Sequence, residues 1–214
     1  METQDLISLR TGAWILIAGA LIFWAGAFAP PYKQWMSPLK EYLSIIHENP
    51  KAWQWINWCI LIGVMVTLFG LVALYPSLTG KAALFSRLAV WLYGFGAILL
   101  IAHMVFRVSV EPWAATEWVT KSQLPSGFES MKLWMGILFA IYMVLAYIAI
   151  GMMGIGFFQS ALLPNWANWI VIGFGFIGAI GYAVRFVFFD PPLMIHLPLL
   201  FLAIMILVKV HGSG

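Results

Sequence analysis

Ionisable side chains interrupt two of the most apolar parts of this sequence. They form two groups: His103, Arg107 and Glu111; and Arg185, Asp190 and His196. The first group lies at the end of one apolar run, and its i, i+4 spacing places all three side chains on one face of a helix. The second lies between two apolar runs. Because ionisable groups at membrane depth are costly, such groups indicate a functional site.

One chemistry that fits these residues is redox chemistry. Two neutral imidazoles on separate helices, His103 and His196, are what a b-type haem needs as axial ligands. Arg107 and Arg185 could neutralise the haem propionates, and Tyr182 shares a helical face with Arg185 at i, i+3. A quinone could use the same His and Tyr groups for hydrogen bonding. The sequence thus predicts cofactor binding by these five residues.

A divalent-metal site is a second possibility. His103, His196, Asp190 and Glu111 are compatible in ligand type, although no HExxH-like pattern is present. A third possibility is that the arginines bind an anionic lipid or a small amphipathic molecule, which the chain would carry or act on.

The same residues also have structural interpretations. Arginines near helix ends extend to the headgroups, an aspartate in a turn caps a helix, and a histidine can hydrogen-bond a neighbouring helix. On that interpretation the chain is an accessory subunit that packs against a larger membrane complex. The sequence contains no phosphate-binding loop, no dinucleotide fingerprint and no Gly-x-Ser-x-Gly elbow. It leaves open whether the protein is an enzyme.

Composition decides the class of protein. Of the 214 residues, 63% are hydrophobic and only 9% are charged, whereas a soluble domain carries about 25% charged residues. The chain is therefore an integral membrane protein in a lipid bilayer. Clustered Lys/Arg runs, which nucleic-acid binding would need, are absent. The single Cys59 excludes an internal disulfide and any cysteine-based metal cluster.

Six segments are apolar enough to cross a bilayer, which takes about 20 residues. They are Gly12–Pro31, Trp53–Tyr75, Leu84–Arg107, Met131–Phe158, Trp166–Phe189 and Pro192–Val210. Pro-containing stops such as Glu111-Pro112 and Pro164-Asn165 bound them. The predicted fold is all-α: a single six-helix transmembrane domain over residues 1–211, with Gly212–Gly214 set aside as a cloning remnant.

The two long loops are expected to carry short interfacial helices. Ser37-Pro38 resembles a helix start, and Asn49-Pro50 would end that helix. Trp113 and Trp118 suggest a similar element in the second long loop. Glycines elsewhere are expected to permit close helix packing. They include Gly94, Gly96, Gly136, Gly151, Gly154, Gly156, Gly173, Gly175, Gly178 and Gly181.

Alternating crossings place His103 and His196 in one leaflet. Each lies four residues from a segment end, at Arg107 and Pro192 respectively, so each is about 6 Å deep. Orientation follows weakly from Lys81 and Arg87 in a short loop, which favour a cytoplasmic N-terminus.

Two junctions resemble a known family. They are Leu74-Tyr75-Pro76-Ser77-Leu78, after the second segment, and Gln159–Trp166, between the fourth and fifth. Both are similar to the corresponding junctions of uncharacterised bacterial six-helix membrane proteins of the domain-of-unknown-function 4386 type. The resemblance implies a fold and a location in a bacterial inner membrane, and it implies no activity.

Overall fold

The computed structural model describes residues 3–29, 37–184 and 194–212. Nearly all of them are helical, as the composition predicted. The helices are α1 (Thr3–Ala27), α2 (Leu39–Glu48), α3 (Pro50–Leu74), α4 (Gly80–Lys121), α5 (Phe128–Ser160), α6 (Asn165–Ala183) and α8 (His196–His211), with a short 3-10 helix, η2 (Tyr75–Ser77).

Within these residues, five helices are long and apolar enough to cross a membrane, and α8 is a shorter apolar helix. This agrees with a polytopic helical membrane protein. The predicted short helix in the first long loop is confirmed as α2, between Pro38 and Asn49.

The second long loop differs from the prediction. Pro112 does not end a helix; it lies inside α4, which runs on to Lys121 and includes Trp113 and Trp118. The separate short helix expected there is therefore wrong. A proline inside a helix costs about 3 kcal/mol. Burial of Ala114 and Ala115, just beyond it, against α2 and α5 residues offsets that cost.

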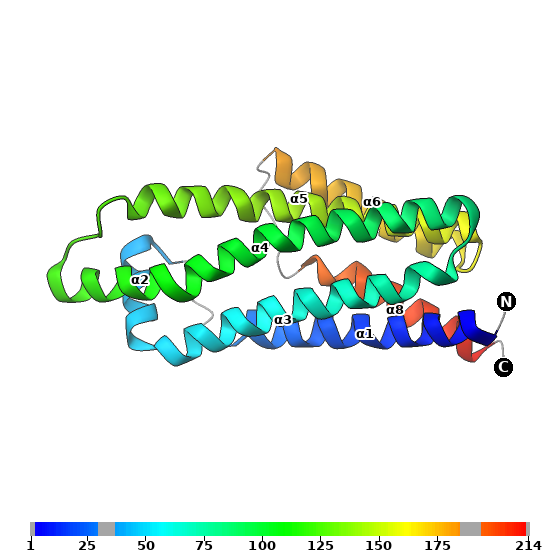
Figure 1. Cartoon of the computed structure of the whole chain (residues 1–214), viewed down its shortest axis with the longest axis horizontal. Helices are drawn as coiled ribbons and strands as arrows, with labels where there is room; N and C mark the ends of the chain where they lie inside the picture. The colour runs from blue at the N-terminus through cyan, green and yellow to red at the C-terminus, as the bar shows by residue number, and fades with distance from the viewer. Residues whose placement is uncertain (1–2, 30–36, 185–193, 213–214) are drawn as a thin grey trace.

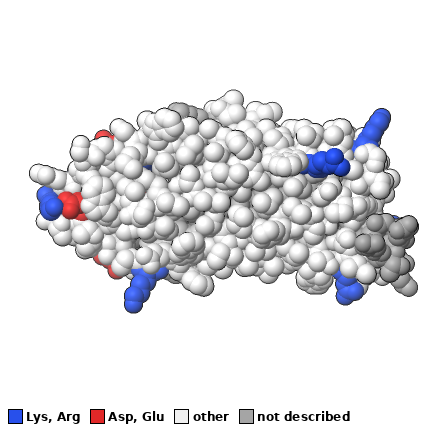
Figure 2. All heavy atoms as spheres, viewed as in Figure 1, with Lys and Arg blue, Asp and Glu red and all other residues white. Residues whose placement is uncertain are grey.

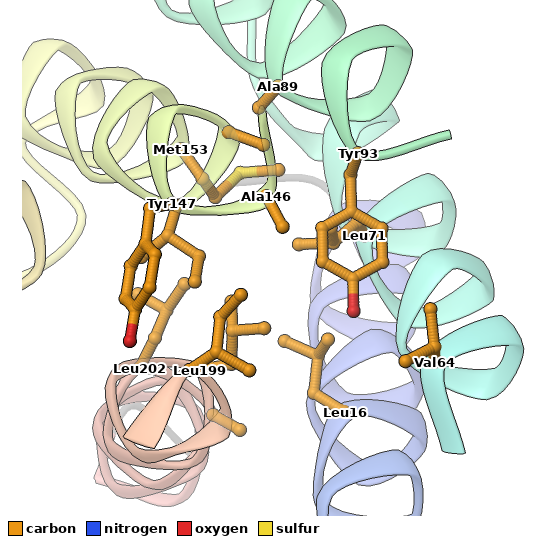
Figure 3. Packing of buried hydrophobic residues seen from close by; sticks show 14 of the residues in the cluster. Leu16, Val64, Leu71, Ala89, Tyr93, Ala146, Tyr147, Met153, Leu199 and Leu202 are labelled. Carbon is orange, nitrogen blue, oxygen red and sulfur yellow. The ribbon is translucent and has the colours of Figure 1, made fainter. Parts of the chain in front are cut away.

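The long helices run roughly along the long axis of the molecule (Figure 1), and their contacts, closed by α6 on α8, form a ring around an apolar core. α1 packs on α3 and α8, α5 packs on α4 and α6, and α3 packs on α4. Figure 3 shows side chains from five of these helices converging, among them Leu16 of α1, Leu71 of α3, Tyr93 of α4, Ala146 of α5 and Leu199 of α8. The ring encloses the residues discussed below.

The α1–α3 contact depends on glycines spaced by seven. Gly12, Gly19 and Gly26 of α1 face α3, and Gly63 and Gly70 of α3 face α1. A Cβ at Gly63 would lie 2.6 Å from the backbone nitrogen of Phe23, and one at Gly26 would lie 2.7 Å from the carbonyl oxygen of Ile56. The two backbones therefore touch, as small residues allow between membrane helices.

The glycines predicted to pack fall into two sets. Gly151, Gly154, Gly156, Gly175 and Gly178 lie against neighbouring helices, as predicted. Gly136, Gly173 and Gly181 have no described neighbour within 4 Å of a Cβ position, so the packing prediction is wrong for these three.

The helix lengths locate the bilayer. Arg87 and Arg107 are twenty residues apart on α4, which is about 30 Å, the thickness of the hydrocarbon core. The remaining fourteen residues of α4 project about 21 Å beyond Arg107. We call this projecting end the head; it comprises Leu39–Trp53, Val108–Lys121 and Phe128–Lys132.

Charge marks the two ends of the molecule. On the face shown in Figure 2, acidic side chains are visible only toward the head, whereas basic ones lie near both ends. The opposite, terminal end carries Arg10, Lys81, Arg87 and Lys209. The middle of the visible face is uncharged, as a lipid-facing surface requires.

Candidate functional site

Two groups of polar residues stand out, one at the base of the head and one in the middle of the bilayer. At the base of the head, Arg107 Nε lies 3.8 Å from Glu111 Oε2, one turn along α4. Both residues are buried, with exposed fractions of 5% and 3%. The predicted i, i+4 face is therefore confirmed for this pair, and the pair points into the protein and not toward lipid.

Residues from other helices complete this group. The Trp53 indole Nε1 donates a hydrogen bond of 2.7 Å to the Arg107 carbonyl, and its ring lies 4.4 Å from the guanidinium carbon. The Tyr42 hydroxyl donates a 2.5 Å hydrogen bond to Glu111. Lys132 Nζ lies 3.9 Å from the centre of the Tyr42 ring. These contacts join α2, α3, α4 and α5 at one point.

The environment of Tyr42 favours its neutral form. Burial is the main cause, and the negative charge of Glu111 adds to it, so the pKa of the Tyr42 phenol lies well above its ordinary value. Tyr42 therefore remains a hydrogen-bond donor to the carboxylate at any physiological pH. These hydrogen bonds, ion pair and ring contacts fix the head on the membrane bundle.

His103 lies one turn deeper than Arg107. Its Nδ1 is 3.0 Å from the Met135 carbonyl oxygen on α5, and its ring is 5.0 Å from that of Phe139. Since a carbonyl can only accept, Nδ1 carries the proton and Nε2 keeps the lone pair. His103 is therefore held in the seam between α4 and α5.

His196 is the first residue of α8 and is completely buried. Its ring stacks on Phe23 of α1, with 4.0 Å between ring centres. Within the described part of the chain, neither Nδ1 nor Nε2 has a hydrogen-bond partner. A buried polar group in that condition costs about 1–3 kcal/mol, so this imidazole is the least satisfied side chain among the residues that the structure describes.

The depth of His196 follows from its neighbours. Trp53 is level with Arg107, and Gly63 lies ten residues further along α3, or about 15 Å deeper. Gly63 abuts Phe23, on which His196 stacks. His196 therefore lies near the middle of the bilayer, whereas His103 is only about 6 Å below Arg107. The two imidazoles thus differ in depth and contact different helices.

Of the other predicted site residues, Tyr182 lies in the described part of the chain. Tyr182 of α6 has its ring 6.2 Å from that of Tyr147 on α5. Arg185 and Asp190 lie outside the described residues. Among the residues that are described, no three His, Cys, Asp or Glu side chains come together as a metal site.

Two tyrosines that the sequence did not single out lie near the middle of the bundle. Tyr93 of α4 and Tyr142 of α5 are fully buried, and their hydroxyls interact with each other without forming a hydrogen bond of good geometry. Tyr93 also interacts with Thr67 of α3. Thr67 is fourteen residues from Trp53, so it lies about 21 Å below the level of Trp53 and Arg107.

A comparison with known protein families shows to which family the chain belongs. Residues 10–210 match the family described as Domain of unknown function (DUF4386). The chain belongs to this family. Searches of curated proteins and of solved structures returned no match. Membership in DUF4386 confirms the resemblance seen in the two helix junctions and assigns no activity.

Some site residues of this DUF4386 chain were missed for identifiable reasons. Tyr42 falls in the predicted interfacial helix and Trp53 at the start of a predicted membrane segment, and only the packing of α2 and α3 on α4 reveals their contacts with Glu111 and Arg107. The depth of Tyr93 was readable: it lies six residues from Arg87 and fourteen from Arg107, in an uncharged stretch. A tyrosine at that position needs a partner for its hydroxyl, which is a usable signal.

Proposed function

We propose that this protein binds a small, membrane-soluble molecule at His196. The observation that carries the proposal is the complete burial of an imidazole whose two nitrogens have no partner in the described part of the chain. Intramembrane polar groups are costly and mark ligand or ion sites. A bound molecule that hydrogen-bonds His196 would remove that cost, which supports a binding site at this position.

The surroundings of His196 favour a flat molecule with a hydrogen-bond acceptor. The Phe23 ring offers an aromatic surface at 4.0 Å. The first backbone N–H groups of α8 have no partners within their own helix and give this helix end a partial positive charge. A neutral imidazole adds one donor and one acceptor. A quinone has this shape and chemistry, so quinone-linked electron transfer is the most concrete form of the proposal.

A b-type haem is the other redox form. The His103 tautomer suits it, because protonated Nδ1 on the Met135 carbonyl leaves Nε2 available to iron. The different depths of His103 and His196 argue against one haem held by both.

The experiment compares His196→Phe with His103→Phe in detergent-purified protein. Phenylalanine keeps a ring of similar size, so each variant removes only the nitrogens. Bound molecules are extracted and identified by mass spectrometry, and the visible spectrum is recorded before and after reduction with dithionite. We expect a stoichiometric ligand in the wild type, its loss in His196→Phe and its retention in His103→Phe.

Other results would replace the proposal. Loss in both variants, with a Soret band in the wild type, would restore the bis-histidine haem. Stoichiometric metal in elemental analysis would favour a metal-dependent membrane enzyme or carrier. A ligand-free, colourless wild type that co-purifies with a larger membrane complex would identify an accessory subunit.

We further propose a bacterial inner membrane as the location, with the terminal end in the cytoplasm. Arg10, Lys81, Arg87 and Lys209 gather at that end, and the positive-inside rule favours this orientation. The head would then lie on the outer side. The test is to treat intact cells with a membrane-impermeant thiol reagent. A cysteine placed at exposed Lys121 should be labelled. Labelling of a cysteine placed at Lys81 instead would reverse the orientation.

A further inference from the structure

Buried polar atoms without good hydrogen-bond partners form a series that starts below the head. In the described part of the chain, this series includes Asn57 Oδ1, both ring nitrogens of His196, and the hydroxyls of Tyr93 and Tyr142. Asn57 is four residues from Trp53, or about 6 Å deep. His196 follows at about 15 Å, and Thr67, next to Tyr93, at about 21 Å.

The series does not continue to the terminal end. Beyond Thr67, the buried positions of α3 are Gly70, Leu71 and Leu74. Across from them on α4 lies Ala89, and the Ser86 hydroxyl is satisfied by the Ala82 carbonyl. Asn168, whose Oδ1 also has no partner among the described residues, is buried in the first turn of α6 near the terminal end, and its Nδ2 donates a hydrogen bond to the Leu163 carbonyl. Figure 3 shows apolar side chains around Tyr93, among them Leu71, Ala89 and Met153.

We propose that water enters the bundle from the head, passes His196 near the middle of the bilayer and reaches the level of Thr67 and Tyr93, about 21 Å below Arg107, and that the part of the bundle beyond Thr67 is closed to it. A buried water makes about three hydrogen bonds to otherwise unsatisfied polar groups. The unpartnered atoms of this series provide such partners at successive depths. Polar side chains at membrane depth are tolerated where they line a water-filled cavity.

The consequence is a one-sided aqueous connection to His196. Water and protons would reach this imidazole from the head face and not from the terminal face. The inference extends the proposed function, since it supplies the His196 site with water, but its test needs no ligand. The two proposals can therefore fail separately.

Two alanines on α4 provide a matched test. Ala97 and Ala89 are each four residues from Tyr93 and are buried to 2% and 0% exposure. Ala97 is ten residues from Arg107 and therefore about 15 Å deep, which is level with His196. Ala89 lies on the other side of Tyr93, toward the terminal end. Each is changed to cysteine in a Cys59→Ala background. A small cationic thiosulfonate, which reacts with thiols in water, is added to either face of sealed vesicles, and mass spectrometry detects the product.

Reference cysteines at Lys121 and Lys81 report the head face and the terminal face. We expect Ala97→Cys to react from the head face only, at a rate at least about tenfold above that of Ala89→Cys from the same face. Thr67→Cys is a second variant, close in volume to the native residue, and is expected to behave like Ala97→Cys. Protection of both from the head face, or reaction of either only from the terminal face, would overturn the proposal.

Discussion

Arg107 and Glu111 form a buried ion pair, with 3.8 Å between Nε and Oε2, at the level where α4 leaves the bilayer. A second pair with the same i, i+4 spacing, Glu117 and Lys121, lies further along the same helix and is exposed. The two pairs differ mainly in burial. The helix therefore contains its own comparison of a buried and an exposed ion pair.

We expect Glu111→Gln to destabilise the protein far more than Glu117→Gln. Removal of one partner of a buried pair leaves the other charge uncompensated and costs about 3–5 kcal/mol. Tyr42 would also lose a charged acceptor. An exposed i, i+4 pair contributes only about 0.3–0.5 kcal/mol. Thermal unfolding in detergent, followed by circular dichroism, measures both; equal midpoints for the two variants would show that the head does not depend on this pair.

Tyr42 should make stability depend on pH in the alkaline range. Its pKa is raised in the folded protein, mainly by burial and then by Glu111, so the folded state holds the proton more tightly than the unfolded state. Its contribution is therefore complete below the ordinary tyrosine pKa and is lost as the pH rises toward the folded value.

The measurement compares wild type with Tyr42→Phe from about pH 8 to pH 11.5. Below about pH 10 the wild type should be more stable by about 1.5–3 kcal/mol, because its hydroxyl bonds a carboxylate. Above that pH the difference should shrink, by at most about 1.4 kcal/mol per pH unit. The lysines titrate in both proteins, so they cancel in the difference. A difference that stays constant across the range would contradict the assignment.

Local signals predicted the elements, and they could not predict contacts between elements. Pro38 and Asn49-Pro50 bound α2 as expected, because caps and prolines act within a few residues. The end of α4 was missed, since Pro112 is tolerated only through packing of Ala114 and Ala115 on other helices. The depth of His196 was missed because it depends on the place where α8 begins relative to α1 and α3.

The glycine spacing in α1 and α3 was a readable signal that leads to a third prediction. Gly63→Ala places a methyl group 2.6 Å from the Phe23 nitrogen, so α1 and α3 must separate. We expect a loss of stability of about 1–3 kcal/mol, typical of overpacking, and disturbance of the Phe23–His196 stack.

Gly136→Ala is the control. Its methyl group meets no described atom within 4 Å, so it should stabilise the protein by up to about 1 kcal/mol through helix propensity. If Gly63→Ala unfolds at the temperature of Gly136→Ala, the close α1–α3 contact is not the stabilising feature described above.

The ligand-free protein should gain from losing His196. Phenylalanine at this position would keep the stack on Phe23 and remove two buried nitrogens that have no partner in the described part of the chain. Replacing an unsatisfied polar group by an apolar one of similar shape is neutral or stabilising, here by up to about 1–3 kcal/mol. His103→Phe removes a satisfied hydrogen bond to Met135 and should lose about 1 kcal/mol. Unfolding of delipidated, ligand-stripped samples separates these effects from ligand binding. A lower midpoint for His196→Phe than for His103→Phe would mean that protein groups or bound water already satisfy the His196 imidazole, which would remove the physical reason for a ligand there.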